Sequence, residues 1–255
     1  MASPARLLKM MRLNHCETRR RYEILFSTLL FLLGSVSASA QPKHVPRSFE
    51  ILTHRMNVDV DGSPRAYGPP GSDTLDYLSN AHTMGNPNAP IVGYVLEDEP
   101  PHRPVVQGPQ DPAPGYYVSQ TAFEDDSIDD ARDPRRYVDA TKISYVVLGN
   151  EARRQGARVG DFVTVYSERT RRAVFGIVGD SGNPTGDEGS LHLLQALGYR
   201  FHDGKNDAVE DSEIVVRFYP GSNPEHEFFR TQKALDKAAG ARGLSRDFSS
   251  YRKDH

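Results

Sequence analysis

Three stretches decide the fold class: ISYVVL (143–148), FVTVYS (162–167) and RAVFGIVGD (172–180). Each is short, apolar and rich in β-branched residues, and the turn-forming residues 156–161 separate the first stretch from the second. We therefore predict three neighbouring strands that form an antiparallel block. The 21 glycines and 18 prolines among 255 residues favour many turns over long helices. The sequence thus predicts a mainly β fold with short helices.

Weaker patterns extend this prediction in both directions along the chain. Further strands are expected at 49–60, 91–96, 116–122 and 213–219, a helical turn at 75–81, and short helices at 191–197 and 228–239. We expect one catalytic domain over 49–222, preceded by a linker at 41–48 and followed by a C-terminal helix and polar tail at 223–255. The polar end, 245–255, is expected to fray.

Residues 1–40 have the pattern of a secretory signal with an N-terminal extension. Three arginines at 19–21 precede an apolar run, 24–33, and small residues end at Ala40. A membrane anchor is the alternative, but the run is shorter than the roughly 20 residues that span a bilayer. Met10 or Met11 is an alternative start. We expect a secreted protein, extracellular or periplasmic, with no membrane contact after signal removal.

The charge balance favours some partners over others. Without residues 1–40 the chain has 25 basic and 32 acidic side chains. Phosphate binding needs a basic surface, so nucleic acid is not an expected partner, whereas a cationic polymer would be attracted. Improved solubility is the simpler account of this charge. The acidic run at 123–133 is either a solvated loop or a lip that binds a polycation.

No pattern of metal ligands or nucleophiles is convincing. The nine histidines form no close spacing, and the single cysteine, Cys16, lies in the predicted leader, so a zinc site is not expected. Asn57, Asp59 and Asp61 resemble the opening of a calcium loop, but the twelfth position is Gly68 rather than glutamate, which excludes that motif. Nucleophile-elbow and phosphate-loop motifs are absent from the sequence.

Two acidic residues flank one glycine- and proline-rich loop. Asp180 ends a predicted strand, and Glu188 precedes a predicted helix at 191–197. Glycoside hydrolysis needs one carboxylic acid and one carboxylate, which this spacing can supply. Alternatively, Asp180 begins a turn and Glu188 caps the helix. A helix dipole would favour an ionised Glu188, and hence the base role, unless burial raises its pKa.

Several ordered motifs resemble glycoside hydrolase family 75 chitosanases. They are Asp61–Tyr67 (DGSPRAY), Asp111–Ser119 (DPAPGYYVS), Arg136–Ala140 (RYVDA), Val178–Asp180 with Glu188–Ser190, and Phe218–Ser222 (FYPGS). The resemblance covers about residues 50–222. It implies endo-hydrolysis of β-1,4-linked glucosamine in chitosan with inversion, and no cofactor. It also implies Asp180 and Glu188 as the essential acids, one of which donates a proton while the other activates water. We favour Glu188 as acid and Asp180 as base, but the resemblance does not assign the two roles.

Four further residues are expected near the site. They are Arg65, Tyr67, Asp139 and Tyr117; Arg65 could instead brace a carboxylate through an ion pair, and Tyr117 could stack on sugar or fill the core. We expect a monomer.

The chain departs from the family at one point: the loop between the acids is slightly short, and Asp187 stands where a glycine is expected. An extra carboxylate there could shift either pKa, alter specificity or mark a lapsed enzyme. Residues 156–199 are also similar to double-psi β-barrels of lytic transglycosylase-like lipoproteins, which implies a six-stranded barrel. Cleavage of another amino-sugar polymer, such as peptidoglycan, and glycan binding without turnover are the alternatives.

Overall fold

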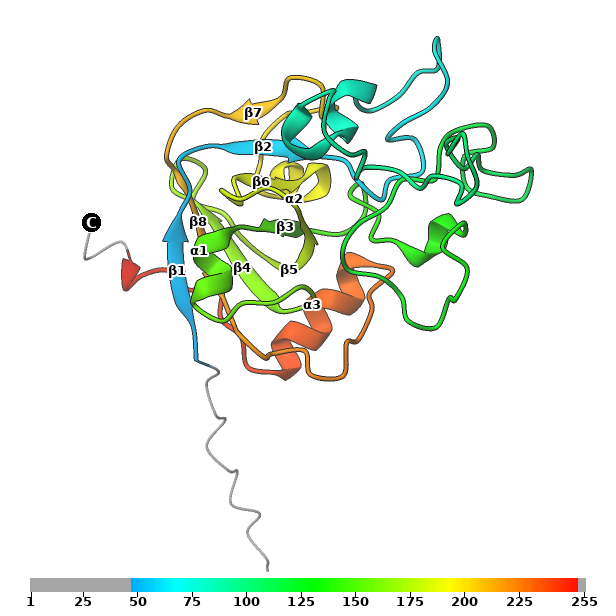
Figure 1. Cartoon of the computed structure of the whole chain (residues 1–255). Helices are drawn as coiled ribbons and strands as arrows, with labels where there is room; N and C mark the ends of the chain where they lie inside the picture. The colour runs from blue at the N-terminus through cyan, green and yellow to red at the C-terminus, as the bar shows by residue number, and fades with distance from the viewer. Residues whose placement is uncertain (1–46, 252–255) are drawn as a thin grey trace, which may run out of the picture. The chain divides into compact units, whose positions relative to one another are not determined.

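In the computed structural model, residues 47–251 are described; the predicted signal and most of the predicted linker lie outside them. Within these residues, eight strands form one curled, half-barrel sheet in the order β1-β8-β4-β5-β3-β6-β2-β7 (Figure 1). The strands are β1 (Phe49–Leu52), β2 (Met56–Asp59), β3 (Tyr145–Leu148), β4 (Phe162–Ser167), β5 (Ala173–Ser181), β6 (Glu188–Ser190), β7 (Ala208–Val209) and β8 (Ile214–Phe218). The predicted mainly β class is confirmed.

The sheet is mixed, so the predicted antiparallel block is wrong in one strand. β4 pairs antiparallel with β5, as expected, and also with β8, but β3 runs parallel to β5. β2 and β6 form a second parallel pair. The chain between β3 and β5 contains a helix and β4, which gives it the length that a parallel crossover requires.

The strands expected at 91–96 and 116–122 are reduced to single bridges, among them Tyr94 with Ser119 and Val106 with Tyr117. Prolines are frequent in this part of the chain, and proline cannot donate to a strand ladder. The long connection between β2 and β3 instead forms loops that gather beside one end of the sheet (Figure 1).

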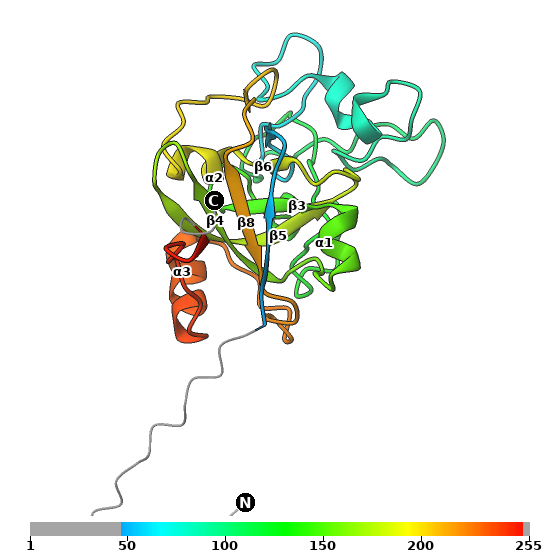
Figure 2. The same ribbon diagram turned by 90° about the vertical axis from the view of Figure 1, so that its left-hand side faces the viewer.

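In the described part of the chain, three short α-helices accompany the sheet: α1 (Asn150–Arg154), α2 (Leu191–Ala196) and α3 (Gln232–Ala241). Single 3-10 turns occur at Leu78–Ala81, Thr83–Gly85 and Pro134–Arg136. Figure 2 shows α1 and α3 on opposite sides of the strands. The helices predicted at 191–197 and 228–239 are thus present with shifted ends, whereas α1 was not predicted. None of the helices within residues 47–251 has the length and apolarity to cross a membrane.

Of the four apolar clusters within residues 47–251, the two largest hold the sheet and its helices in place. Alternate residues of β4 serve both, because Val163 and Val165 join the cluster around α2, whereas Phe162 joins the cluster beneath α3. Leu235 of α3 is completely buried in the second cluster. The expected fraying is wrong for residues 245–251, since Phe248 stacks on Tyr166 with ring centroids 5.0 Å apart.

Candidate active site

A polar cleft of about 450 Å³ opens where the end of β5 meets β2 and β6. Its floor and walls carry six carboxylic side chains and two basic ones. They are Asp59, Asp61, Asp76, Asp180, Glu188 and Asp207, with Arg55 and Lys205. Both acids predicted from the sequence, Asp180 and Glu188, therefore line the same cleft, as does Tyr67.

A bulge in β5 positions Asp180. Val146 of β3 pairs with Val178, but the next residue, Val147, pairs with Asp180, so Gly179 is an extra residue. A side chain at Gly179 would lie 2.6 Å from the Tyr145 side chain, which explains why glycine stands there. Such a bulge reverses the alternation of side chains along a strand. It therefore turns Asp180 toward the cleft.

Two main-chain groups then fix the Asp180 carboxylate. Its Oδ1 accepts hydrogen bonds from the N–H groups of Ala122 and Ser181, each at 2.8 Å. The Ala122 segment is itself attached to the bulge, because the N–H of Phe123 donates to the carbonyl oxygen of Gly179 at 2.9 Å. Asp180 is thus held by contacts that favour its ionised form.

Glu188 reaches the cleft from the neighbouring strand β6, opposite Asn57 of β2. The alternative in which Glu188 caps the following helix is wrong. Ser190 is the N-cap of α2, and its Oγ accepts the N–H of Leu193 at 3.1 Å. The helix-dipole argument for an ionised Glu188 therefore loses its basis, and Glu188 is free to serve the cleft.

Asp59 and Asp61 complete the floor at the end of β2. Carboxyl oxygens of Asp59, Asp61 and Asp180 all lie within 4.8 Å of one another. The Asp59 Oδ1 accepts the N–H of Asp61 at 2.8 Å, and the Asp61 Oδ1 accepts the Tyr67 hydroxyl at 2.8 Å. Three oxygens at this spacing could ligate a hard divalent cation. Without a cation, the three carboxyl groups would instead hold one or more protons between them, because negative charges this close to one another oppose the ionisation of all three groups.

Burial and mutual repulsion raise the pKa of these acids. The pKa of Asp59 rises to about 6 and that of Glu188 to about 7, in both cases mainly through burial. Burial and the charge of Asp59 also raise the pKa of Asp180 well above its usual range, against the effect of its two N–H donors. Burial raises the pKa of Asp61 well above normal as well. The cleft therefore holds protonated carboxyl groups near neutral pH.

Two tyrosines brace the floor from below. Tyr67 is almost fully buried and donates to Asp61, so its predicted place near the site is consistent with the structure. The Tyr145 hydroxyl donates to the main-chain oxygen of Asp61 at 3.1 Å and also lies beside the Asp59 carboxyl, whose pKa it lowers. Burial raises the pKa of both tyrosines well above 10, so both remain neutral donors.

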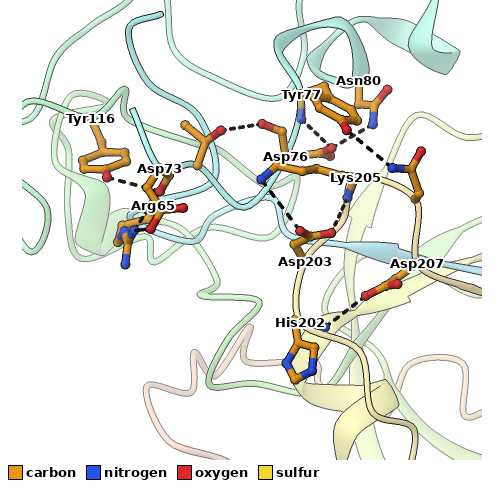
Figure 3. A network of polar contacts seen from close by, with 12 residues as sticks. Arg65, Asp73, Asp76, Tyr77, Asn80, Tyr116, His202, Asp203, Lys205 and Asp207 are labelled. Carbon is orange, nitrogen blue, oxygen red and sulfur yellow. Dashed lines mark hydrogen bonds and ion pairs between the residues drawn. The ribbon is translucent and has the colours of Figure 1, made fainter. Parts of the chain in front are cut away.

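The loop at 202–207 and the segment 74–80 meet at one end of the cleft (Figure 3). The N–H of Gly204 donates to the Leu75 carbonyl oxygen at 2.9 Å, and Lys205 lies 6.0 Å from the centre of the Tyr77 ring. Asp76 is buried here, where its Oδ1 accepts the N–H of Tyr77 and the Asn80 amide, each at 2.7 Å. Burial raises the pKa of Asp76 to about 7.

Three predicted site residues do not line the cleft. Arg65 is exposed, pairs with Asp73 at 2.6 Å and lies 5.5 Å from the Tyr116 ring centre (Figure 3). Tyr117 packs against Tyr94, with ring centroids 5.2 Å apart. Asp139 accepts the Thr141 hydroxyl at 2.6 Å and pairs with Lys142 at 2.7 Å. For two of these residues the contacts match the alternatives considered from the sequence: Arg65 forms an ion pair with a carboxylate, and Tyr117 packs against another side chain.

Asp59 and Asp76 line the cleft but were not predicted from the sequence. Asp59 was considered only as a calcium ligand and was set aside with that motif. Its relation to Asp180 depends on the β2–β6–β3–β5 order of the sheet, which local spacing does not reveal. The signal that could have found it is the pair Asp59 and Asp61 at a predicted strand end, the same kind of position as Asp180.

No protein-family model matches the chain, and a search of curated proteins found no match.

Proposed function

We propose that this protein is an endo-acting glycoside hydrolase that cleaves chitosan in the cleft between β2, β5 and β6. The observation that carries the proposal is that Asp180 and Glu188, from different strands, line one cleft in which burial raises the pKa of both. A carboxyl group that holds a proton near neutral pH is what a general acid requires. The proposed fold is a six-stranded double-psi barrel within the larger sheet.

In the proposed mechanism Glu188, with a pKa of about 7, donates its proton to the oxygen of the leaving sugar. Asp180 must be ionised to act as the base; its two N–H donors favour that form, against the burial that raises its pKa. It then accepts a proton from a water molecule that attacks the anomeric carbon from the opposite face. The glycosidic bond breaks, the new bond to the water oxygen forms, and the configuration inverts. Glu188 then recovers a proton from solvent, and Asp180 releases to solvent the proton that it took from the water, which returns both groups to their starting states.

The charge of the cleft supports a cationic substrate. Six carboxylic groups face two basic ones, and both basic side chains already have acidic partners: Arg55 lies 3.2 Å from Glu210, and Lys205 lies 3.7 Å from Asp203. Although the raised pKa values keep part of these carboxyl groups protonated in the free protein, the ammonium groups of glucosamine units would favour their ionised form and be attracted to it. We expect the protein to act as a secreted monomer without a cofactor.

Peptidoglycan is the second candidate substrate. Arg55 and Lys205 line the cleft and could contact the carboxylates that peptidoglycan carries and chitosan lacks. Binding without turnover is less well supported, because it gives no reason for two acids with raised pKa values to face one cleft.

Release of reducing ends tests the proposal. Purified protein is incubated with soluble chitosan and, separately, with peptidoglycan, alongside the Asp180→Asn and Glu188→Gln variants. Release from chitosan that both substitutions abolish would support the two-acid mechanism. Release from peptidoglycan alone would favour the second substrate, and binding to chitosan without release would replace hydrolysis by simple glycan recognition.

A further inference from the structure

Asp76 has no part in the reaction described above, although it lines the same cleft. Only 7% of its surface is exposed. Its Oδ1 accepts the main-chain N–H of Tyr77 and the side-chain amide of Asn80, each at 2.7 Å. Because both donors belong to one short segment of the chain, they fix the direction of the carboxyl group. One oxygen of this acid is therefore fully used by the fold.

The second oxygen of Asp76, Oδ2, has no partner within residues 47–251. No hydrogen bond reaches it, and no lysine or arginine nitrogen lies within 4.0 Å of it. It is not sealed from solvent either, because the only unpartnered side-chain atoms of that kind in the described residues are Ser63 Oγ and the Tyr166 hydroxyl. Burial raises the pKa of Asp76 to about 7, as expected for a carboxyl group that no cation neutralises. Oδ2 is thus an open acceptor that faces the cleft.

Gly204 keeps this oxygen open on the side of the loop at 202–207. Its N–H donates to the Leu75 carbonyl oxygen at 2.9 Å, which holds the loop against the segment that carries Asp76. A side-chain carbon at position 204 would lie 3.2 Å from Oδ2 and 3.2 Å from the Val58 carbonyl oxygen. Gly204 does not have a positive φ, so its backbone conformation does not explain the glycine. A larger residue there would cover the open acceptor.

Asp76 lies on the side of the cleft that also carries the proposed acid. Gly204 approaches both Asp76 and the main chain of Val58. Val58 of β2 pairs with Gly189, the residue that follows Glu188 on β6. One oligomer bound in the cleft can therefore contact Asp76 and Glu188 together.

The surface next to Asp76 suits a sugar ring. Tyr77 is 48% exposed, and its hydroxyl accepts the Asn206 amide at 3.5 Å, so the ring is held at the end of the cleft (Figure 3). Aromatic side chains beside a few well-placed polar groups are typical of ligand sites. Lys205, which also lies here, has its own carboxylate partner, Asp203, at 3.7 Å. This end of the cleft therefore offers an apolar face and a carboxyl group without a cationic partner.

We propose that Asp76 binds the amino group of a glucosamine unit at this end of the cleft, with the sugar ring against Tyr77. The inference rests on the proposed hydrolase function and deepens it, because it assigns the choice between free and acetylated amino sugars to one residue. An ammonium group brings both the hydrogen-bond donors and the positive charge that Oδ2 lacks. An acetamido group brings one N–H and no charge, so it leaves the buried carboxylate without a counter-charge.

The test is the binding of a glucosamine oligomer and of the matching N-acetylglucosamine oligomer, measured by isothermal titration calorimetry near neutral pH. Glu188→Gln serves as the parent, so that neither ligand is consumed. Asparagine at 76 keeps the oxygen that accepts the two hydrogen bonds and places an NH2 group, which cannot accept one, where Oδ2 was. Adding Asp76→Asn is expected to weaken binding of the glucosamine oligomer by about 10- to 100-fold and of the acetylated oligomer by less than about threefold. No loss for the glucosamine oligomer, or an equal loss for both, would overturn the assignment.

Asp207→Asn is the matched control. Asp207 also lines the cleft from the loop at 202–207, and its Oδ2 accepts the N–H of His202 at 3.0 Å. The substitution removes the same charge from the same wall without altering the open acceptor. We expect it to weaken binding of the glucosamine oligomer by less than about threefold, through the general field of the cleft. A loss as large as that in Asp76→Asn would assign the preference to net charge and contradict a specific contact.

Two amide signals of the Glu188→Gln parent report on the same contact without a substitution at 76. The N–H of Tyr77 and the side-chain amide of Asn80 donate to the Asp76 carboxyl group, so their NMR signals are expected to shift when the glucosamine oligomer binds. If other signals of the cleft shift and these two do not, the proposed contact is refuted.

Cleavage by the unmodified protein separates this inference from the proposed function. If the protein cleaves neither chitosan nor peptidoglycan but the preference that depends on Asp76 is present, the hydrolase is refuted and the amino-sugar site stands. If the protein cleaves chitosan and Asp76→Asn leaves both KM and kcat unchanged, the hydrolase stands and the assignment of Asp76 is wrong.

Discussion

The apolar layer beneath α3 and the acidic cleft are built from the same strands but use burial in opposite ways. β5 contributes Ile177, fully buried, to the apolar layer and, three residues later, Asp180 to the cleft. The bulge at Gly179 lies between them. Burial of Ile177 stabilises the fold, whereas burial of Asp180 raises its pKa and opposes its charge. The apolar layer stabilises the fold, whereas the cleft contains buried acidic groups whose ionisation opposes folding.

The largest expected effect is a loss of activity, without loss of the fold, when a proposed catalytic acid of the cleft is replaced. Asp180→Asn and Glu188→Gln should each reduce turnover about 10³-fold, since they remove general base or acid catalysis. Asparagine at 180 can still accept the N–H groups of Ala122 and Ser181, so the fold should survive. Initial rates and thermal unfolding of the same samples check this. If the variants lose activity because they have unfolded, as a large fall in melting temperature would show, these acids have a structural role instead.

Leu235→Ala tests the apolar layer beneath α3, where we expect a loss of stability without a change in the chemistry of the cleft. The side chain is fully buried between α3 and the sheet, and its truncation should lower the free energy of unfolding by about 3 kcal/mol. Urea denaturation measures the loss. The pH profile of the folded enzyme should remain unchanged, because the substitution alters no charge in the cleft. A shifted profile would show that the two regions are electrostatically or mechanically coupled.

Asp76→Asn tests whether buried acids in the cleft reduce stability. Burial raises the pKa of Asp76 from 3.8 to about 7. Between about pH 4 and pH 7, the folded protein therefore keeps a proton on Asp76 that the unfolded chain has released. The stability associated with that proton is complete below about pH 4 and is lost as pH rises through 7. Asparagine should therefore stabilise the protein at pH 8, by up to about 4 kcal/mol, and much less at pH 4.

Urea denaturation at both pH values provides the comparison, with unmodified protein as reference. Asparagine at 76 can still accept the Tyr77 and Asn80 hydrogen bonds, so the difference between the two pH values isolates the charge. The same change in stability at pH 4 and pH 8 would show that ionisation of Asp76 is not the cause.

The smallest effect is expected outside both regions. Arg65 forms an exposed pair with Asp73, and such pairs contribute little to stability. Arg65→Ala should change the free energy of unfolding by less than about 1 kcal/mol and leave kcat/KM within about twofold. A large rise in KM with unchanged stability would show that substrate extends beyond the cleft to Arg65.

The sequence predicted those parts of the fold that depend on local pattern. β4 matches its predicted range, and Ser190 to Ala196 forms a capped helix close to the predicted 191–197. The parallel pairing of β3 with β5 was missed, because an apolar strand pattern does not specify the direction of its partner. Strands were predicted at 91–96 and 116–122, where Tyr94 and Tyr117 form only single bridges. The reason is related: a strand-like pattern does not show whether a neighbouring strand exists.

The candidate site was predictable in its two acids and not in their surroundings. Asp180 and Glu188 were predicted because both flank one short loop and both belong to the motifs that resemble the chitosanases. Asp59 was missed because it is 121 positions from Asp180 in the chain and meets it through the sheet order. Arg65 and Asp139 were expected near the site because they belong to the motifs that resemble the chitosanases, yet local ion pairs with Asp73 and Lys142 hold their side chains.

The central claim is that the acidic cleft hydrolyses a β-linked amino-sugar polymer with inversion, and the most direct measurement follows the first product by proton NMR. Purified protein is mixed with a soluble chitosan oligomer, and the anomeric signals are recorded within minutes, before mutarotation equilibrates them. The account predicts that the α-anomer appears first and that Asp180→Asn yields no new anomeric signal. Initial appearance of the β-anomer, or no product from folded protein, would contradict it.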